Sequence, residues 1–282
     1  MSFAYVNGIN ISYEISGNGF PVIFIHGFGS KKEIWKPQVI ELSKKFKTIT
    51  FDLRGTGLSD RPDYPYTMAI FADDIKGLMD YLQIESAHII GRSLGGMIGQ
   101  NFVLKYPQYV KKLVLIATNA KFDDEATADL IIENRIKNTE LSKEDPVKAF
   151  WNNSKFLYHQ KFRQELKRNP KKKFYGVFSL EDLIEESKTN PSRPQDIRNQ
   201  GSAMKGHNTI DILHQIKSQT LLLAASNDRL IPKSTVDDIH KRIPNSIMKV
   251  ISNAGHFMTL SKAPEINDII LEFLKSEFEV DS

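Results

Sequence analysis

Short apolar segments alternate with longer amphipathic segments along most of the chain. The apolar segments are five to seven residues long and lie near residues 22–26, 47–52, 87–91, 112–117, 219–225 and 246–251. Most of the stretches between them have the spacing of apolar residues that is typical of helices. Strands that alternate with helices usually pair in parallel, because each crossover needs enough chain to span the sheet. The pattern predicts an α/β fold with a mostly parallel sheet and helices on both faces.

The amino-terminal region predicts a β-hairpin ahead of this alternation. Phe3 to Val6 and Ile9 to Ile15 are two alternating segments that flank Asn7-Gly8. Asn-Gly favours a two-residue hairpin turn, since both residues readily adopt a positive φ. These two strands bring the predicted sheet to eight strands.

The alternation breaks once, from about Ala120 to His207. This segment shows no convincing strand, and its periodicity predicts helices at Glu125 to Thr139, Pro146 to Trp151, Phe156 to Lys167, Leu180 to Lys188 and Pro194 to Lys205. It is too long for a loop within a compact domain, so we expect a helical cap over the carboxyl ends of the strands. The predicted organisation is a core formed by 1–119 and 208–282 with a cap at 120–207.

Composition narrows the classes of protein and of partner. The 282 residues are 40% hydrophobic, which is enough for one large core with an insertion. The net charge of +4, from 38 basic and 34 acidic residues, does not indicate a nucleic-acid partner. We see no signal peptide and no segment that could span a bilayer, and we expect no stable membrane association. A homodimer is compatible with the sequence.

The absence of cysteine excludes a disulfide, a thiol nucleophile and a zinc-thiolate site. It is compatible with a cytoplasmic protein, which is the location we expect. The seven histidines show no close metal-ligand spacing. We therefore expect neither a metal nor a cofactor.

The segment Gly91-Arg92-Ser93-Leu94-Gly95-Gly96 carries the strongest chemical signal. It follows the predicted strand at 87–91 and precedes a helical segment that begins near Met97. A Gly-x-Ser-x-Gly sequence at a sharp turn from strand to helix exposes the serine hydroxyl, and the glycines avoid collisions across the turn. Ser93 is the predicted nucleophile.

A serine nucleophile needs a base, and the base needs a carboxylate that orients it. Asp228 lies in the loop after the apolar strand at 219–225, and His256 lies in the loop after the strand at 246–251. We predict that Asp228 is the acid and His256 the general base. Asp123, beyond the strand at 112–117, is an alternative position for the acid.

Two backbone N–H groups are predicted to form an oxyanion hole. The strand at 22–26 ends in the loop His26-Gly27-Phe28-Gly29, whose glycines allow a close approach to the serine. We expect the N–H groups of Phe28 and Leu94 to bind the developing negative charge. His26 is expected to hold this loop rather than to act as a second base.

Together these motifs resemble the α/β-hydrolase superfamily with a helical cap. The resemblance extends from the His26 loop through Asp52-Leu53-Arg54-Gly55 and the Ser93 turn to Asp228 and His256, and it is similar to carboxylesterases and 3-oxoadipate enol-lactonases. Ser93 argues against the dehalogenases and epoxide hydrolases of this superfamily, which carry Asp at the nucleophile position.

The resemblance implies a serine hydrolase of small, partly apolar esters or lactones. Carbon–carbon bond hydrolases, cofactor-free perhydrolases and small-molecule receptors with a retained triad are the alternatives. The first of these typically continue the oxyanion loop with a Gly-Pro-Gly-like segment, which Gly29-Ser30-Lys31 lacks.

Two further expectations concern residues near the site. Phe28, Trp151 and Phe257 are expected to contact the substrate. The family often has His where Arg92 stands, and we expect Arg92 to extend behind the turn and to pair with a carboxylate.

Overall fold

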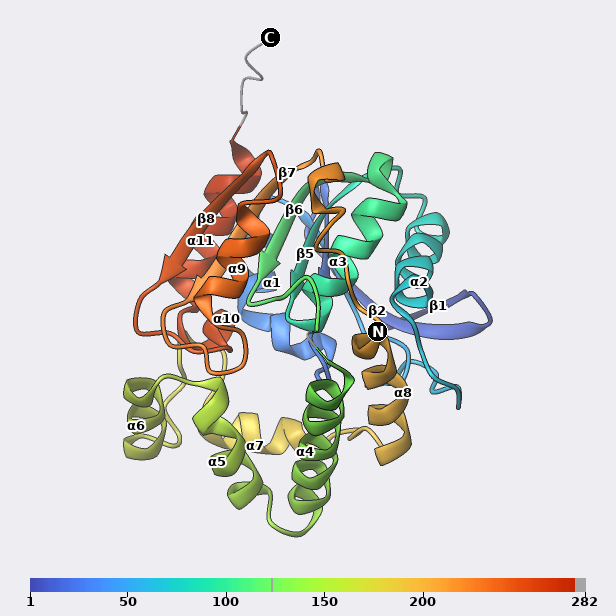
Figure 1. The fold of residues 1–282 in the computed structure, drawn as a ribbon. Helices are drawn as coiled ribbons and strands as arrows, with labels where there is room; N and C mark the ends of the chain where they lie inside the picture. The colour runs from blue at the N-terminus through green and yellow to red at the C-terminus, as the bar shows by residue number, and fades with distance from the viewer. Residues whose placement is uncertain (123, 277–282) are drawn as a thin grey trace.

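An eight-stranded sheet forms the centre of the molecule (Figure 1). The computed structural model describes residues 1–122 and 124–276. The strand order is β1-β2-β4-β3-β5-β6-β7-β8, and the strands are Ser2–Val6, Ile9–Ser16, Pro21–Ile25, Lys47–Phe51, Ala87–Arg92, Val110–Ile116, Gln219–Ala225 and Ser246–Ile251 for β1 to β8. β1 and β2 form the predicted antiparallel hairpin, and β3 to β8 run parallel. The predicted α/β fold is confirmed.

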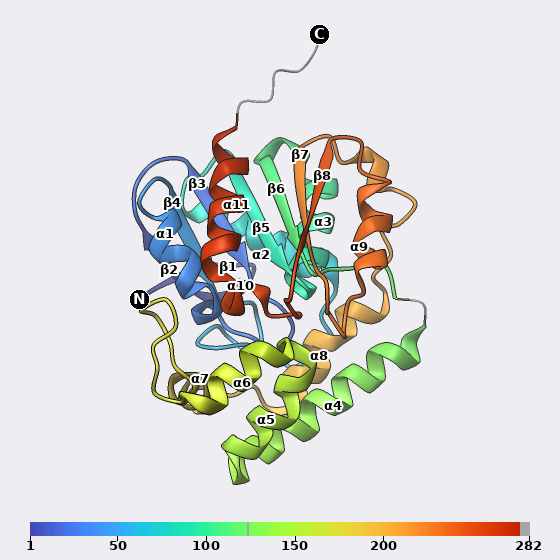
Figure 2. The same cartoon turned by 90° about the vertical axis from the view of Figure 1, so that its left-hand side faces the viewer.

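Alternate residues of the parallel strands enter two separate cores. Val22 and Phe24 of β3 pack on one face with Trp35 and Leu42, whereas Ile23 and Ile25 pack on the other face. The first face is covered by α1 (Lys36–Leu42) and α11 (Ala263–Lys275), and the second by α2 (Met68–Tyr81), α3 (Leu94–Lys105) and α9 (Lys233–His240), as Figure 2 shows. Because both faces are buried, the strands are apolar almost throughout.

Five helices lie together below the sheet in Figures 1 and 2. They are α4 (Glu125–Glu144), α5 (Pro146–Leu157), α6 (Gln160–Arg168), α7 (Leu180–Lys188) and α8 (Pro194–Lys205). The predicted boundary between the second and third of these helices was wrong, because the chain breaks at Tyr158 and His159. There the His159 ring accepts a hydrogen bond from the Lys161 N–H at 3.3 Å and caps α6. The division into 1–119, 120–207 and 208–282 stays a prediction.

These helices bond directly to the loops at the carboxyl ends of the strands. The Gln200 side chain of α8 accepts a hydrogen bond from the Gly29 N–H at 2.7 Å. The Leu157 carbonyl at the end of α5 accepts one from the Phe257 N–H at 2.9 Å. α5 and α8 therefore help to set the position of these two loops. In the described part of the chain, no helix is both long and apolar enough to cross a membrane.

Candidate active site

Ser93 occupies a strained turn between β5 and α3. Its backbone has φ 55° and ψ −122°, a region that residues other than glycine rarely adopt. A β-carbon on Gly91 would lie 2.2 Å from the Gly95 carbonyl oxygen, and one on Gly95 would lie 2.1 Å from the Ile25 carbonyl oxygen. Both glycines are therefore required for the turn to close, and Ser93 is left half-buried at the end of the strand.

Asp228 and His256 form a buried pair. The Asp228 Oδ2 and His256 Nδ1 atoms are 2.8 Å apart, and the two side chains are only 1% and 4% exposed. Asp228 Oδ1 accepts the backbone N–H groups of Leu230 and Ile231 at 2.8 and 2.9 Å, which fixes the carboxylate. The His256 ring is thus oriented through Nδ1, and Nε2 has no partner among the described residues. Nε2 is therefore available to a serine hydroxyl.

Two N–H groups beside Ser93 are unpaired. No described carbonyl or side chain accepts a hydrogen bond from Phe28 or Leu94, whereas the N–H of the adjacent Gly29 is bonded to Gln200 and that of Ser93 to Ile116. A β-carbon on Gly27 would lie 3.2 Å from the Ser93 β-carbon, so the loop passes close to the turn. The geometry leaves free the two donors that the sequence assigns to the oxyanion hole.

The His26 side chain holds the loop that contains Gly27 and Phe28 in place. Its Nδ1 lies 2.9 Å from the Gly27 carbonyl oxygen, and its Nε2 accepts the Leu53 N–H at 3.1 Å. Burial lowers the pKa of His26, which keeps the ring neutral. These contacts match the structural role expected for this residue.

Four of the predicted site residues line one cleft of about 900 Å³. Ser93, His256, Phe28 and Phe257 all line it. Further lining residues could not be found from local sequence signals; they include Met97, Ile131, Arg135, Met204 and Leu230. Among the described residues, no group of three His, Cys, Asp or Glu side chains could hold a metal ion.

Trp151 does not line the cleft, because it packs against Phe150 in an aromatic cluster of the helices below the sheet. Asp123, the alternative acid, lies outside the described residues.

The expectation that Arg92 pairs with a carboxylate was wrong. Its side chain is buried, donates to Ser30 Oγ at 3.2 Å and places its guanidinium carbon 3.9 Å from the centre of the Phe257 ring. Nε and Nη1 have no hydrogen-bond partner in the described chain. Burial lowers the pKa of Arg92 to about 10, and the electrostatic influence of Tyr158 and Asp228, which raises this pKa, offsets the effect only in part. Arg92 still carries its charge at neutral pH.

We predict that Arg92→Met raises the free energy of unfolding at pH 7 by about 1 to 3 kcal/mol. The folded state disfavours the charged guanidinium, so the charge lowers the free energy of unfolding of wild type. This loss is complete below pH 10 and declines as pH rises from 10 toward 12.5. Urea unfolding of both proteins at pH 7 and pH 10.5 measures the difference, which should be smaller at the higher pH. A less stable variant at pH 7 would show that Arg92 contributes favourably to the fold.

The chain is similar to known proteins along most of its length. The alpha/beta hydrolase fold family matches residues 21–263. A protein of Yersinia enterocolitica named "Putative carbamate hydrolase RutD" is 27% identical over 273 residues, which cover 93% of this chain and 91% of that protein. The AB hydrolase superfamily protein YisY of Bacillus subtilis is 28% identical over 276 residues, and the similarity covers 95% of this chain and 96% of YisY.

Solved structures share the same architecture. A thermophilic esterase from Thermogutta terrifontis, solved with malate bound, superposes with a TM-score of 0.80 at 26% identity and covers 97% of each chain. The enol-lactonase from Burkholderia xenovorans superposes with a TM-score of 0.81 at 20% identity and covers 98% of this chain and 100% of its own.

Proposed function

The chain belongs to the α/β-hydrolase fold family, and we propose that it is a serine hydrolase that cleaves carboxylic esters or lactones through an acyl-enzyme. The observation that carries the proposal is the arrangement around one cleft, where the strained Ser93 and the Asp228-oriented His256 lie together.

The mechanism uses each of these groups in turn. His256 Nε2 takes the proton from Ser93 Oγ as the oxygen attacks the substrate carbonyl carbon, and Asp228 stabilises the imidazolium. The N–H groups of Phe28 and Leu94 bind the oxyanion of the tetrahedral intermediate. His256 then protonates the leaving alkoxide, which departs and leaves Ser93 acylated. A water molecule, deprotonated by His256, attacks the acyl-enzyme and releases the acid.

The shape and lining of the cleft support a small, partly apolar substrate. Phe28, Ile131 and Phe257 offer apolar surface to the cleft, whereas Asn134 and Asn138 of α4 offer amide groups. A cleft that combines apolar side chains with hydrogen-bonding groups is typical of sites for small molecules.

A carbamate is the second candidate substrate. The Yersinia relative, which is similar along nearly the whole chain, is named for carbamate hydrolysis. Ser93 would attack a carbamate carbonyl carbon in the same way, and the same N–H groups would bind the oxyanion, but the leaving group can be an amine. The two candidate functions therefore differ in substrate and use the same catalytic residues.

A substrate panel tests the proposal. We expect multiple turnovers on short 4-nitrophenyl esters or on γ-lactones and none with Ser93→Ala, measured by initial rates with carbamates in parallel. Turnover confined to carbamates would favour the second candidate. One slow turnover with ligand-induced thermal stabilisation would favour a receptor, and equal rates for wild type and Ser93→Ala would refute the catalytic assignment.

A further inference from the structure

The cleft concentrates positive charge. Its described lining residues include the basic side chains of Arg92, Arg135, Lys137 and Lys155 and a single carboxylate, that of Asp238. The whole chain, in contrast, has a net charge of only +4. Charges of one sign around a cleft raise the local concentration of oppositely charged ligands. The distribution indicates an anionic ligand.

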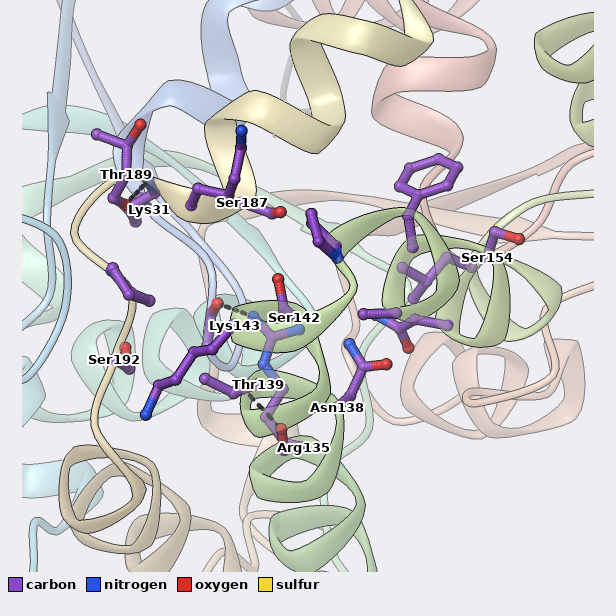
Figure 3. A pocket seen from close by; sticks show the side chains of 18 of the residues that line it. Lys31, Arg135, Asn138, Thr139, Ser142, Lys143, Ser154, Ser187, Thr189 and Ser192 are labelled. Carbon is purple, nitrogen blue, oxygen red and sulfur yellow. Dashed lines mark hydrogen bonds between the residues drawn. The ribbon is translucent and has the colours of Figure 1, made fainter.

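A second cavity of about 450 Å³ continues this surface (Figure 3). It shares Arg135, Asn138, Asn153 and Leu157 with the first cleft, and its described lining residues include no carboxylate. Lys31, which lines the second cavity, forms an ion pair with Glu186 at 2.6 Å. Glu186 therefore already compensates part of the positive charge of this cavity. Arg135 stands where the two cavities meet.

The Arg135 guanidinium has an N–H donor without a hydrogen-bond partner in the described chain. Its Nη2 donates to the Gly29 carbonyl oxygen, while its buried Nε has no partner in the described chain. No described carboxylate forms an ion pair with it, and burial lowers the pKa of the guanidinium. Asn138, one turn further along α4, lines the same wall. A guanidinium with this environment is suited to bind a planar anion.

Arg92, at the end of β5, adds a second charge without a carboxylate partner, and it contacts the same loop. It donates to Ser30, next to the Gly29 that Arg135 contacts, and it is 1% exposed with Nε and Nη1 unpaired. A buried charge without a counterion is costly to a fold. A negatively charged ligand in the cleft would offset that cost for both arginines.

We propose that the cleft takes a substrate bearing a carboxylate, and that Arg135 is the residue that binds this carboxylate. The inference rests on the proposed hydrolysis of esters or lactones. It adds that the substrate is negatively charged. The apolar side chains Phe28, Ile131 and Phe257 contact the body of the substrate between its carboxylate and the carbonyl that Ser93 attacks.

Two matched substrate pairs test this preference. The first pair is mono-4-nitrophenyl adipate and its methyl ester, which places the carboxylate on the acyl side. The second pair is 4-acetoxybenzoate and methyl 4-acetoxybenzoate, which places it on the leaving group. We expect kcat/KM of wild type to favour the free acid at least about tenfold in one pair, and this preference to weaken at high salt.

Substitutions then separate recognition from loop positioning. Arg135→Gln should lower kcat/KM for the preferred acid by about 10- to 100-fold and that for its methyl ester by less than about threefold, whereas Arg135→Lys should retain part of the preference. Arg198→Gln is the matched control, because Arg198 lies on α8 outside the cleft and pairs with Glu133 at 3.3 Å. It should leave all four rates unchanged.

Three outcomes are decisive. Hydrolysis without an acid preference in either pair overturns the proposal, and so does an equal loss for both members of a pair in Arg135→Gln, which would give Arg135 a positioning role alone. If neither pair is hydrolysed, the assignment of ester hydrolysis fails, and thermal shifts with adipate and 1,6-hexanediol decide whether the cleft binds a carboxylate. Stabilisation by adipate that is lost in Arg135→Gln supports carboxylate binding, and equal shifts in both proteins refute it.

Discussion

Replacing His256 by alanine is expected to lower kcat for the best ester substrate by a factor on the order of 10⁵ to 10⁶. Without the imidazole, no group removes the proton from Ser93 Oγ or returns it to the leaving alkoxide. The free donors of Phe28 and Leu94 remain, so a residual rate above that of water should persist. Initial rates at high enzyme concentration measure the loss, and an unchanged unfolding curve would show that the fold is intact.

Ser93 and His256 should act as one catalytic unit. The double variant Ser93→Ala/His256→Ala should lose no more activity than either single variant, because each single change already removes the concerted step. His214→Ala is the control, since His214 is exposed and lies outside the cleft. Additive losses in the double variant would contradict a shared role for Ser93 and His256.

Gly95→Ala is expected to destabilise the fold by more than about 3 kcal/mol, and the expressed protein should be largely insoluble. The new β-carbon would lie 2.1 Å from the Ile25 carbonyl oxygen and 2.7 Å from that of His26, so strand β3 and the start of α3 would have to separate. Urea unfolding of any soluble fraction measures the loss.

Gly99→Ala provides a matched control on the same helix. Its β-carbon would meet only side chains, the nearest at 3.6 Å, and alanine favours a helix over glycine by about 1 kcal/mol. Gly99→Ala should therefore be at least as stable as wild type. Equal stability of the two variants would show that the Ser93 turn has more room than the geometry indicates.

Much of the core could be predicted because its signals are local. The apolar strands and the Asn7-Gly8 turn predicted all eight strands, and Ser93, Asp228 and His256 each follow the end of a strand. In a parallel sheet those ends meet at one edge, so sequence order alone predicts that the three residues converge.

The residues contributed by the five helices below the sheet could not be predicted in the same way. α4 has polar residues on most of its surface, and only its docking decides that Arg135 and Asn138 face the cleft. The helix break at Tyr158 carries no Gly or Pro signal. Trp151 shows that aromatic character does not separate packing from substrate contact. For Arg92, only the tertiary structure shows that no carboxylate accompanies the buried charge.

In the proposed mechanism Ser93 is a nucleophile activated by His256. Incubation with diisopropyl fluorophosphate, followed by intact-mass analysis and peptide mapping, tests this activation. We predict one adduct per chain, located on Ser93, absent in Ser93→Ala and formed far more slowly in His256→Ala. An adduct on another residue, or labelling of His256→Ala at the wild-type rate, would contradict the account.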